Sequence, residues 1–220
     1  MNFLYIFLII YLIPLIAYII MYLMLNKYND IDNKKEISGF EVARNILDKH
    51  QLDDMYIVEK KGYFTDVYDT KQNVIRLSSP VFHNDSVYSL AISSYFATKA
   101  FLFNEGVKSV KFKLLIDNFI KILTNFVYLL LLVGIVLNSF PTYKVVLILF
   151  VIILLYNILT IPIEDKITKN SIKELVEKKY ISKGDKDIKT IYTFMKVYGI
   201  AQMVIALSNL YYNIKEDIKK

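Results

Sequence analysis

The chain has 220 residues, of which 55% are hydrophobic, and a mean hydropathy of +0.38, which is too apolar for a soluble domain of this size and predicts a membrane protein. It contains no cysteine, which excludes disulfides, thiolate nucleophiles and cysteine-based metal sites. The net charge of +6 arises from 27 basic and 21 acidic residues that are intermingled, a pattern typical of solvated faces, so we expect no nucleic-acid partner.

The N-terminal segment is a long apolar run. Residues 3–25 contain no charged side chain, and they exceed the length of about 20 residues that crosses a hydrocarbon core. The segment has neither the basic start nor the small-residue cleavage site of a signal peptide. We therefore predict that residues 1–25 form a transmembrane anchor, in which Pro14 is tolerated.

Residues 26–118 form the largest polar region and predict one small α+β domain. Ser38 and Glu41 have the spacing of a capping box, which predicts a helix that ends near His50. Two β-prone runs, 55–59 and 73–77, flank a predicted loop over 62–69. After a short polar turn, residues 86–103 predict a buried helix capped by Asp85 or Ser86. The expected order is helix, strand, strand, helix.

The second half of the chain returns to the membrane. Residues 122–137 and 145–161 predict two spans joined by a turn, so that residues 119–163 form a transmembrane hairpin. Residues 164–220 predict polar helices with a turn near 182–185, followed by an apolar helix over 191–212. That last helix is either a fourth span or an amphipathic interfacial helix. The expected fold is an α-helical membrane protein with a small α+β domain.

Basic residues are unevenly distributed between the polar segments. Residues 26–121 contain 14 Lys and Arg and residues 164–190 contain eight, whereas the 138–144 turn contains only Lys144. Because positively charged segments tend to stay in the cytoplasm, we predict a multi-pass cell-membrane protein with its polar domain in the cytoplasm.

Four stretches occur in an order and spacing that resemble one protein family. They are Ser38-Gly39-Phe40-Glu41-Val42-Ala43-Arg44, Thr65-Asp66-Val67-Tyr68-Asp69, Val74-Ile75-Arg76-Leu77-Ser78 followed by His83, and Ile161-Pro162-Ile163-Glu164. Together they resemble the bacterial membrane-bound neutral zinc metallopeptidases, a zincin-like family. The resemblance covers residues 1–212 and implies an anchor, a small domain whose helix carries a His-Glu-x-x-His motif, further membrane helices, and zinc as the family's cofactor.

The helix over 86–103 occupies the place of the family's active-site helix, but it lacks the motif. The alignment puts Tyr95 and Lys99 at the two histidine positions, Phe96 at the general-base glutamate and Thr98 at a glycine. A phenol is a poor zinc ligand and a protonated lysine has no lone pair. We therefore expect no catalytic residue, no bound metal and no cofactor, with Tyr95 and Phe96 acting as packing groups.

Glu164 falls where the family's acidic residue would complete the zinc site. We hypothesise that the Lys99 ammonium group occupies the space of the missing cation and pairs with Glu164. A separation above about 6 Å would exclude close charge pairing. In the alternative, Lys99 reaches water and Glu164 caps or solvates a helix end.

The resemblance leaves three interpretations of the function. In the first, the chain is a non-catalytic relative that lies in the lipid bilayer and binds or regulates a membrane protein or peptide. In the second, it is an active zinc peptidase with non-standard ligands from His83, Asp66, Asp69 and Glu164. These residues otherwise predict turns, with Asp66 and Asp69 shaping one and His83 in another. In the third, the chain is a structural membrane protein.

Overall fold

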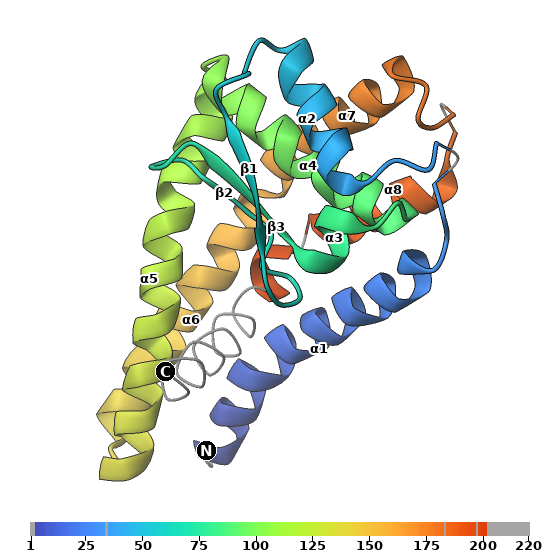
Figure 1. Cartoon of the computed structure of the whole chain (residues 1–220). Coiled ribbons are helices and arrows are strands. Elements are labelled where there is room, and N and C mark those ends of the chain that lie inside the picture. The colour runs from blue at the N-terminus through green and yellow to red at the C-terminus, as the bar shows by residue number, and fades with distance from the viewer. Residues whose placement is uncertain (1–2, 34, 183, 197, 202–220) are drawn as a thin grey trace, which may run out of the picture. The chain divides into compact units, whose positions relative to one another are not determined.

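The computed structural model describes residues 3–33, 35–182, 184–196 and 198–201 (Figure 1). The chain divides into two compact units. One comprises Tyr22–Leu114 and Pro162–Lys196, and the other comprises Met1–Met21, Leu115–Ile161 and Val197–Lys220. The polar segment that follows the predicted hairpin therefore belongs to the same unit as the predicted α+β domain.

Three helices within the described residues are long and apolar enough to cross a membrane. They are α1 (Phe3–Asn29), α5 (Lys108–Leu137) and α6 (Phe140–Leu159), the last followed by α7 (Ile161–Glu177) after Thr160. The chain is thus a mostly helical membrane protein. Most of the predicted helix over 191–212 lies outside the described residues, because the description ends at residue 201.

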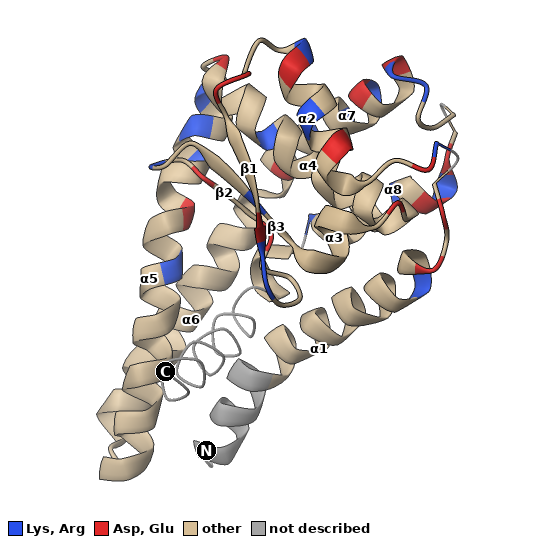
Figure 2. Cartoon of the chain, viewed as in Figure 1, with Lys and Arg blue, Asp and Glu red and all other residues tan. Residues whose placement is uncertain are grey.

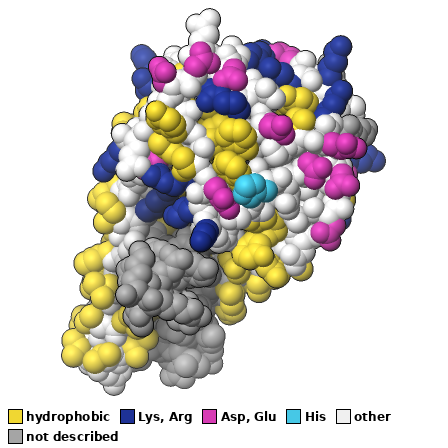
Figure 3. All heavy atoms as spheres, viewed as in Figure 1, with side chains coloured by type: hydrophobic (Ala, Val, Ile, Leu, Met, Phe, Trp, Pro, Cys, Tyr) yellow, Lys and Arg dark blue, Asp and Glu magenta, His cyan; other side chains and the backbone are white. Residues whose placement is uncertain are grey.

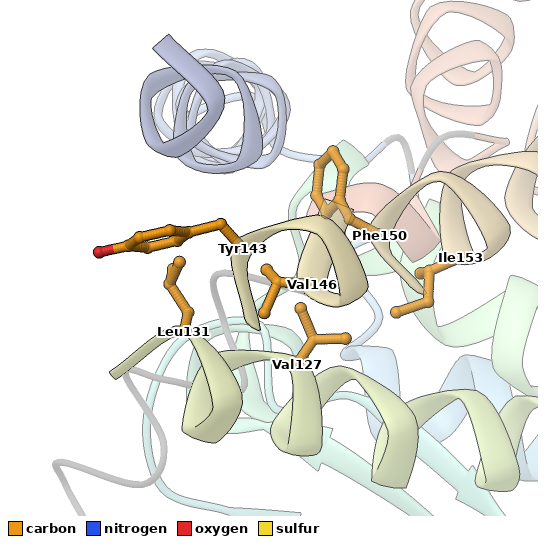
Figure 4. Packing of buried hydrophobic residues seen from close by; sticks show 6 residues of the cluster. All are labelled: Val127, Leu131, Tyr143, Val146, Phe150 and Ile153. Carbon is orange, nitrogen blue, oxygen red and sulfur yellow. The ribbon is translucent and has the colours of Figure 1, made fainter. Parts of the chain in front are cut away.

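The membrane hairpin has its own apolar core. Val127 and Leu131 of α5 pack against Tyr143, Val146 and Phe150 of α6, and the cluster also includes Ile153 (Figure 4). The predicted turn is shorter than expected, because α6 begins at Phe140 and not near residue 145. Figure 2 shows α6 and the adjoining part of α5 almost entirely in tan, and Lys144 is the one charged residue of α6.

A three-stranded sheet lies in the α+β unit, with the order β1-β3-β2. Strands β1 (Tyr56–Lys60) and β3 (Val74–Ser78) match the two predicted runs and pair in parallel. Strand β2 (Val67–Asp69) lies in the segment predicted as a loop, and it pairs antiparallel with β3. Three residues are too few for a periodic signal, so this strand depends on its partner.

Helix α2 (Gly39–Lys49) begins as the sequence predicts. The Ser38 side chain accepts a hydrogen bond from the Glu41 amide, and the Glu41 carboxylate accepts one from the Ser38 amide at 2.7 Å, so the capping box is confirmed. Gly39 lies against α3 (Ser79–His83), where an added Cβ would be 2.0 Å from the Val81 carbonyl oxygen. The polar turn that the sequence predicts before the central helix contains this short helix, α3.

Helix α4 (Val87–Asn104) is the central helix of this unit and confirms the predicted buried helix. The Ser86 hydroxyl caps it by accepting a hydrogen bond from the Ser89 amide at 3.1 Å. Every residue from Tyr88 to Leu102 is buried. Helices α7 and α8 (Lys186–Met195) flank the predicted turn near 182–185, and Tyr192 of α8 shares a 2.6 Å hydrogen bond with Ser94 of α4.

Candidate functional site

The buried helix α4 places Tyr95 and Lys99 on one face, because residues four apart lie one above the other along a helix. Tyr95 is 1% exposed and Lys99 is 8% exposed. The Lys99 ammonium donates a hydrogen bond to the Tyr95 hydroxyl at 3.2 Å. A lysine in the middle of a buried helix requires compensation of its charge, so the groups that face it define the site.

Glu164 supplies a negative charge from the first turn of α7. Glu164 is 6% exposed, and its carboxylate accepts a 2.5 Å hydrogen bond from the Tyr95 hydroxyl. The Lys99 Nζ lies 3.8 Å from Glu164 Oε1, well inside the 6 Å that close pairing allows. The structure therefore brings together the two residues that the sequence analysis paired, and it adds Tyr95 as a hydrogen-bond bridge between them.

A second ammonium group reaches the same carboxylate from α5. Lys113 is 6% exposed, and its Nζ lies 2.8 Å from Glu164 Oε1. The sequence did not single out Lys113, which is buried although the nearby Lys108 and Lys111 are exposed. One signal was available: Lys113 lies three residues after the apolar Val110, on the helix face that turns inward, whereas Lys108 and Lys111 do not.

We call Tyr95, Lys99, Lys113 and Glu164 the buried ion cluster. Its chemistry does not match a zinc site. Zinc is held by histidine nitrogens, cysteine sulfurs and carboxylate oxygens, whereas this cluster offers one carboxylate that already faces two ammonium groups and a phenol. Among the described residues, no group of three His, Cys, Asp or Glu side chains could hold a metal ion. The residues present therefore do not fit zinc.

Phe96, which the family resemblance aligns with the general base, is a packed aromatic ring. Phe96 is 3% exposed and meets Tyr95 edge to face, with the ring centroids 5.0 Å apart. A phenyl ring can neither accept a proton nor orient a water molecule. Next to it, Thr98 is fully buried, and its hydroxyl finds no hydrogen-bond partner among the described residues.

The other candidate ligands lie with separate partners. Asp66 is buried and accepts hydrogen bonds from the Ser78 amide at 2.7 Å and the Ser78 hydroxyl at 3.0 Å. Burial raises the pKa of the Asp66 carboxyl to about 6, although the bonds from Ser78 act in the opposite direction. Asp66 is thus a buried acceptor that ties two segments together, and not the turn residue that the sequence predicts.

Asp69 and His83 are more exposed. The Asp69 carboxylate accepts hydrogen bonds from the backbone amides of Lys71 and Gln72, which is the turn that the sequence predicts, and it also pairs with Arg76 at 2.8 Å. The His83 side chain is 62% exposed, and its Nε2 lies 3.2 Å from Glu59 Oε2. The structure therefore does not assemble Asp66, Asp69, His83 and Glu164 into one site.

The same unit also contains a surface recess. The end of α1, the segment around Tyr63 and helix α3 enclose a pocket of about 540 Å³, lined by Leu25, Asn26, Asn29, Asp30, Tyr63, Ser79, Pro80, His83 and Asn84. The four residues of the buried ion cluster do not line it. The cluster residues are buried, whereas this pocket is a separate surface recess with several polar side chains in its wall.

These features define a mostly helical membrane protein with a small α+β unit, in whose interior two lysines, a tyrosine and a glutamate form a buried cluster. The family described as "Putative neutral zinc metallopeptidase" matches residues 3–216, and the chain belongs to this family. A relative, "Putative membrane protease YugP" of Bacillus subtilis (strain 168), is 24% identical over 185 residues, which cover 84% of this chain and 82% of the relative. No solved structure matches the chain.

Proposed function

We propose that this chain is a non-catalytic member of the zinc metallopeptidase family, in which Lys99 and Lys113 supply the positive charge that zinc supplies in catalytic members. The observation that carries the proposal is the contact between Glu164 and both ammonium groups, at 2.8 Å from Lys113 and 3.8 Å from Lys99. An ionised carboxylate buried without a cation is costly. The two lysines therefore keep the acidic residue compatible with a closed, metal-free interior.

The absence of a general base supports the same conclusion. Peptide hydrolysis by a zincin requires a carboxylate that takes a proton from the metal-bound water. Phe96 stands at that position, and Glu164 is already engaged by Tyr95 and the two lysines. The cluster can hold the helices together, but it has no group with which to activate water.

Peptidase activity tests this proposal directly. We expect the purified chain to leave casein and unstructured peptides intact, with or without added zinc. The variant that carries Tyr95→His, Phe96→Glu and Lys99→His restores the motif of the family and serves as the matched comparison. Cleavage by the unmodified chain that a chelator abolishes would overturn the proposal and favour an active enzyme with non-standard ligands.

We further propose that the chain acts by binding a membrane protein or peptide, and that a catalytic relative is the candidate partner. The polar pocket between α1 and α3 supports this role, because Tyr63 is 61% exposed and the His83 side chain 62% exposed at its wall. Coexpression with a motif-bearing relative in the same membrane, followed by affinity capture, tests the role. We expect Tyr63→Ala and His83→Ala to weaken capture. Capture that both changes leave intact, or no capture at all, argues for a purely structural membrane protein.

We also propose that the α+β unit faces the cytoplasm, based on its content of basic residues. Because the chain has no cysteine, single introduced cysteines report the side of the membrane without background. An impermeant maleimide applied to intact cells should label Asn138→Cys in the hairpin turn, and Tyr63→Cys only after permeabilisation. The reverse pattern would invert the topology.

A further inference from the structure

The pocket at the C-terminal end of α1 combines apolar and polar surface. Leu25 and Pro80 line it with hydrocarbon, and Leu25 is only 4% exposed. Asn26 and Asp30 are exposed lining residues, and Tyr63 is 61% exposed. The volume of about 540 Å³ is within the range of about 300–1,000 Å³ that is usual for ligand pockets. The pocket therefore suits a group with an apolar stem and a polar head.

The charge at this pocket is negative. Asp30 contributes a carboxylate, and the described lining residues include neither lysine nor arginine. Within the described part of the chain, no hydrogen bond or ion pair engages the Asp30 carboxylate. Lys27, the closest lysine in the sequence, lies 4.9 Å from the centroid of the Tyr28 ring and does not line the pocket. Asp30 is thus available to a cation from another molecule.

A second carboxylate lies next to two of the lining residues. Glu59 of β1 accepts a hydrogen bond from the Ser79 hydroxyl at 2.5 Å, and its Oε2 lies 3.2 Å from His83 Nε2. These hydrogen bonds hold the pKa of the Glu59 carboxyl below its usual range, and the charge of Lys61 acts in the same direction. Glu59 is therefore ionised at neutral pH beside the pocket. Figure 3 shows acidic side chains on both sides of the visible histidine.

The asparagines of the wall add a further acceptor. The Asn84 side-chain nitrogen donates a hydrogen bond to Asn29 Oδ1 at 3.1 Å, and the Ser86 hydroxyl approaches the same oxygen at 3.5 Å. These contacts use the donor group of Asn84 and leave its side-chain oxygen without a donor among the described residues. The pocket therefore offers acceptors both on α1 and at the end of α3.

An arginine side chain matches this combination of groups. Its guanidinium carries five donors and a full positive charge, and its planar face stacks on aromatic rings such as that of Tyr63. Its aliphatic stem covers apolar surface such as that of Leu25 and Pro80. A carboxylate or phosphate would be repelled by Asp30 and the neighbouring Glu59, and a neutral group would leave both charges without a counterion.

We propose that this pocket receives an arginine side chain of the protein or peptide partner, with the guanidinium paired to Asp30 and stacked on Tyr63. The inference rests on the proposed binding role of the chain and names the group of the partner that the pocket recognises. The chain as a whole has a net charge of +6 and repels basic peptides. A preference for arginine therefore reports this local site and not a general attraction.

Peptide binding to the full chain in mild detergent tests the inference. The probes are acetyl-Gly-Arg-Gly-amide and its citrulline analogue, in which a neutral urea replaces the guanidinium at nearly the same shape. By calorimetric titration we expect the arginine peptide to bind about fivefold more tightly, the effect of an exposed ion pair together with a cation–π contact. Asp30→Asn should abolish this preference. Asp54→Asn removes an exposed carboxylate that does not line the pocket, and should retain it.

The possible outcomes separate this inference from the proposed function. Equal binding of the two peptides, or a preference that survives Asp30→Asn, would overturn the arginine site. If Tyr63→Ala still weakens capture of the relative in that case, the proposed binding role stands without it. An arginine preference without capture of any relative would remove the relative as the partner and retain the arginine site. Displacement of the arginine peptide by an equal concentration of phosphoethanolamine would assign the pocket to a lipid head group and overturn the inference.

Discussion

Replacing Glu164 with glutamine should destabilise the α+β unit strongly. The substitution keeps the shape of the side chain and removes the negative charge that faces Lys99 and Lys113. At an effective dielectric constant of about 20, a separation of 2.8 Å corresponds to an attraction of about 6 kcal/mol and 3.8 Å to about 4 kcal/mol. Desolvation of the three buried charges offsets part of this attraction. Breaking a buried pair by removing one partner typically costs about 3–5 kcal/mol, which is the loss that we expect.

The matched control lies on the same helix. Glu177 also pairs with two lysines, but its side chain is 44% exposed, so Glu177→Gln should change the free energy of unfolding by less than about 1 kcal/mol. Both free energies can be measured by denaturant titration in a mild detergent, with near-ultraviolet circular dichroism as the probe. A loss for Glu164→Gln no larger than that of the control would refute the cluster as a structural substitute for a metal.

Three further variants test other parts of the α+β unit. Burial raises the pKa of Asp66 to about 6, above the unfolded value of about 3.9, so the folded state binds the extra proton and the free energy of unfolding should fall by about 3 kcal/mol as pH rises from about 4 through 6. Asp66→Asn should remove this pH dependence of the free energy of unfolding. A free-energy difference between the wild-type and Asp66→Asn proteins that is the same at every pH would contradict the prediction. Thr98→Val replaces a buried hydroxyl that lacks a partner among the described residues, and should raise the free energy of unfolding by about 1 kcal/mol; a loss of stability would mean that the hydroxyl is bonded. Gly39→Ala should cost about 1–3 kcal/mol because its methyl group meets the Val81 carbonyl, whereas Gly184→Ala, with open space around it, should cost little in the same thermal-unfolding assay.

The local features of the fold could be predicted because their signals are local. The capping box at Ser38 and Glu41, the anchor helix and the buried helix α4 each depend on residues within one or two turns, and the structure confirms all three. The short strand β2 was missed, because three residues acquire strand geometry only through their register with β3.

The site, by contrast, depends on contacts between residues that are far apart in the sequence. The pairing of Lys99 with Glu164 could be inferred only through the family resemblance, because the two residues are 65 positions apart and on different helices. Lys113 could not be placed by that route, since the resemblance assigns no function to its position. Its side chain reaches Glu164 because it lies on the buried face of α5 with Val110 and Leu114, and a helical pattern alone does not say which distant carboxylate that face meets.

The bound zinc content of the purified chain tests the central claim most directly. After incubation with excess zinc and removal of free metal, mass spectrometry of the elements gives the number of zinc ions per chain. We expect well below one per chain for the unmodified protein, and about one per chain for the variant with Tyr95→His, Phe96→Glu and Lys99→His. One zinc ion per unmodified chain that is lost on Glu164→Gln would contradict the assignment of the site to lysine ammonium groups.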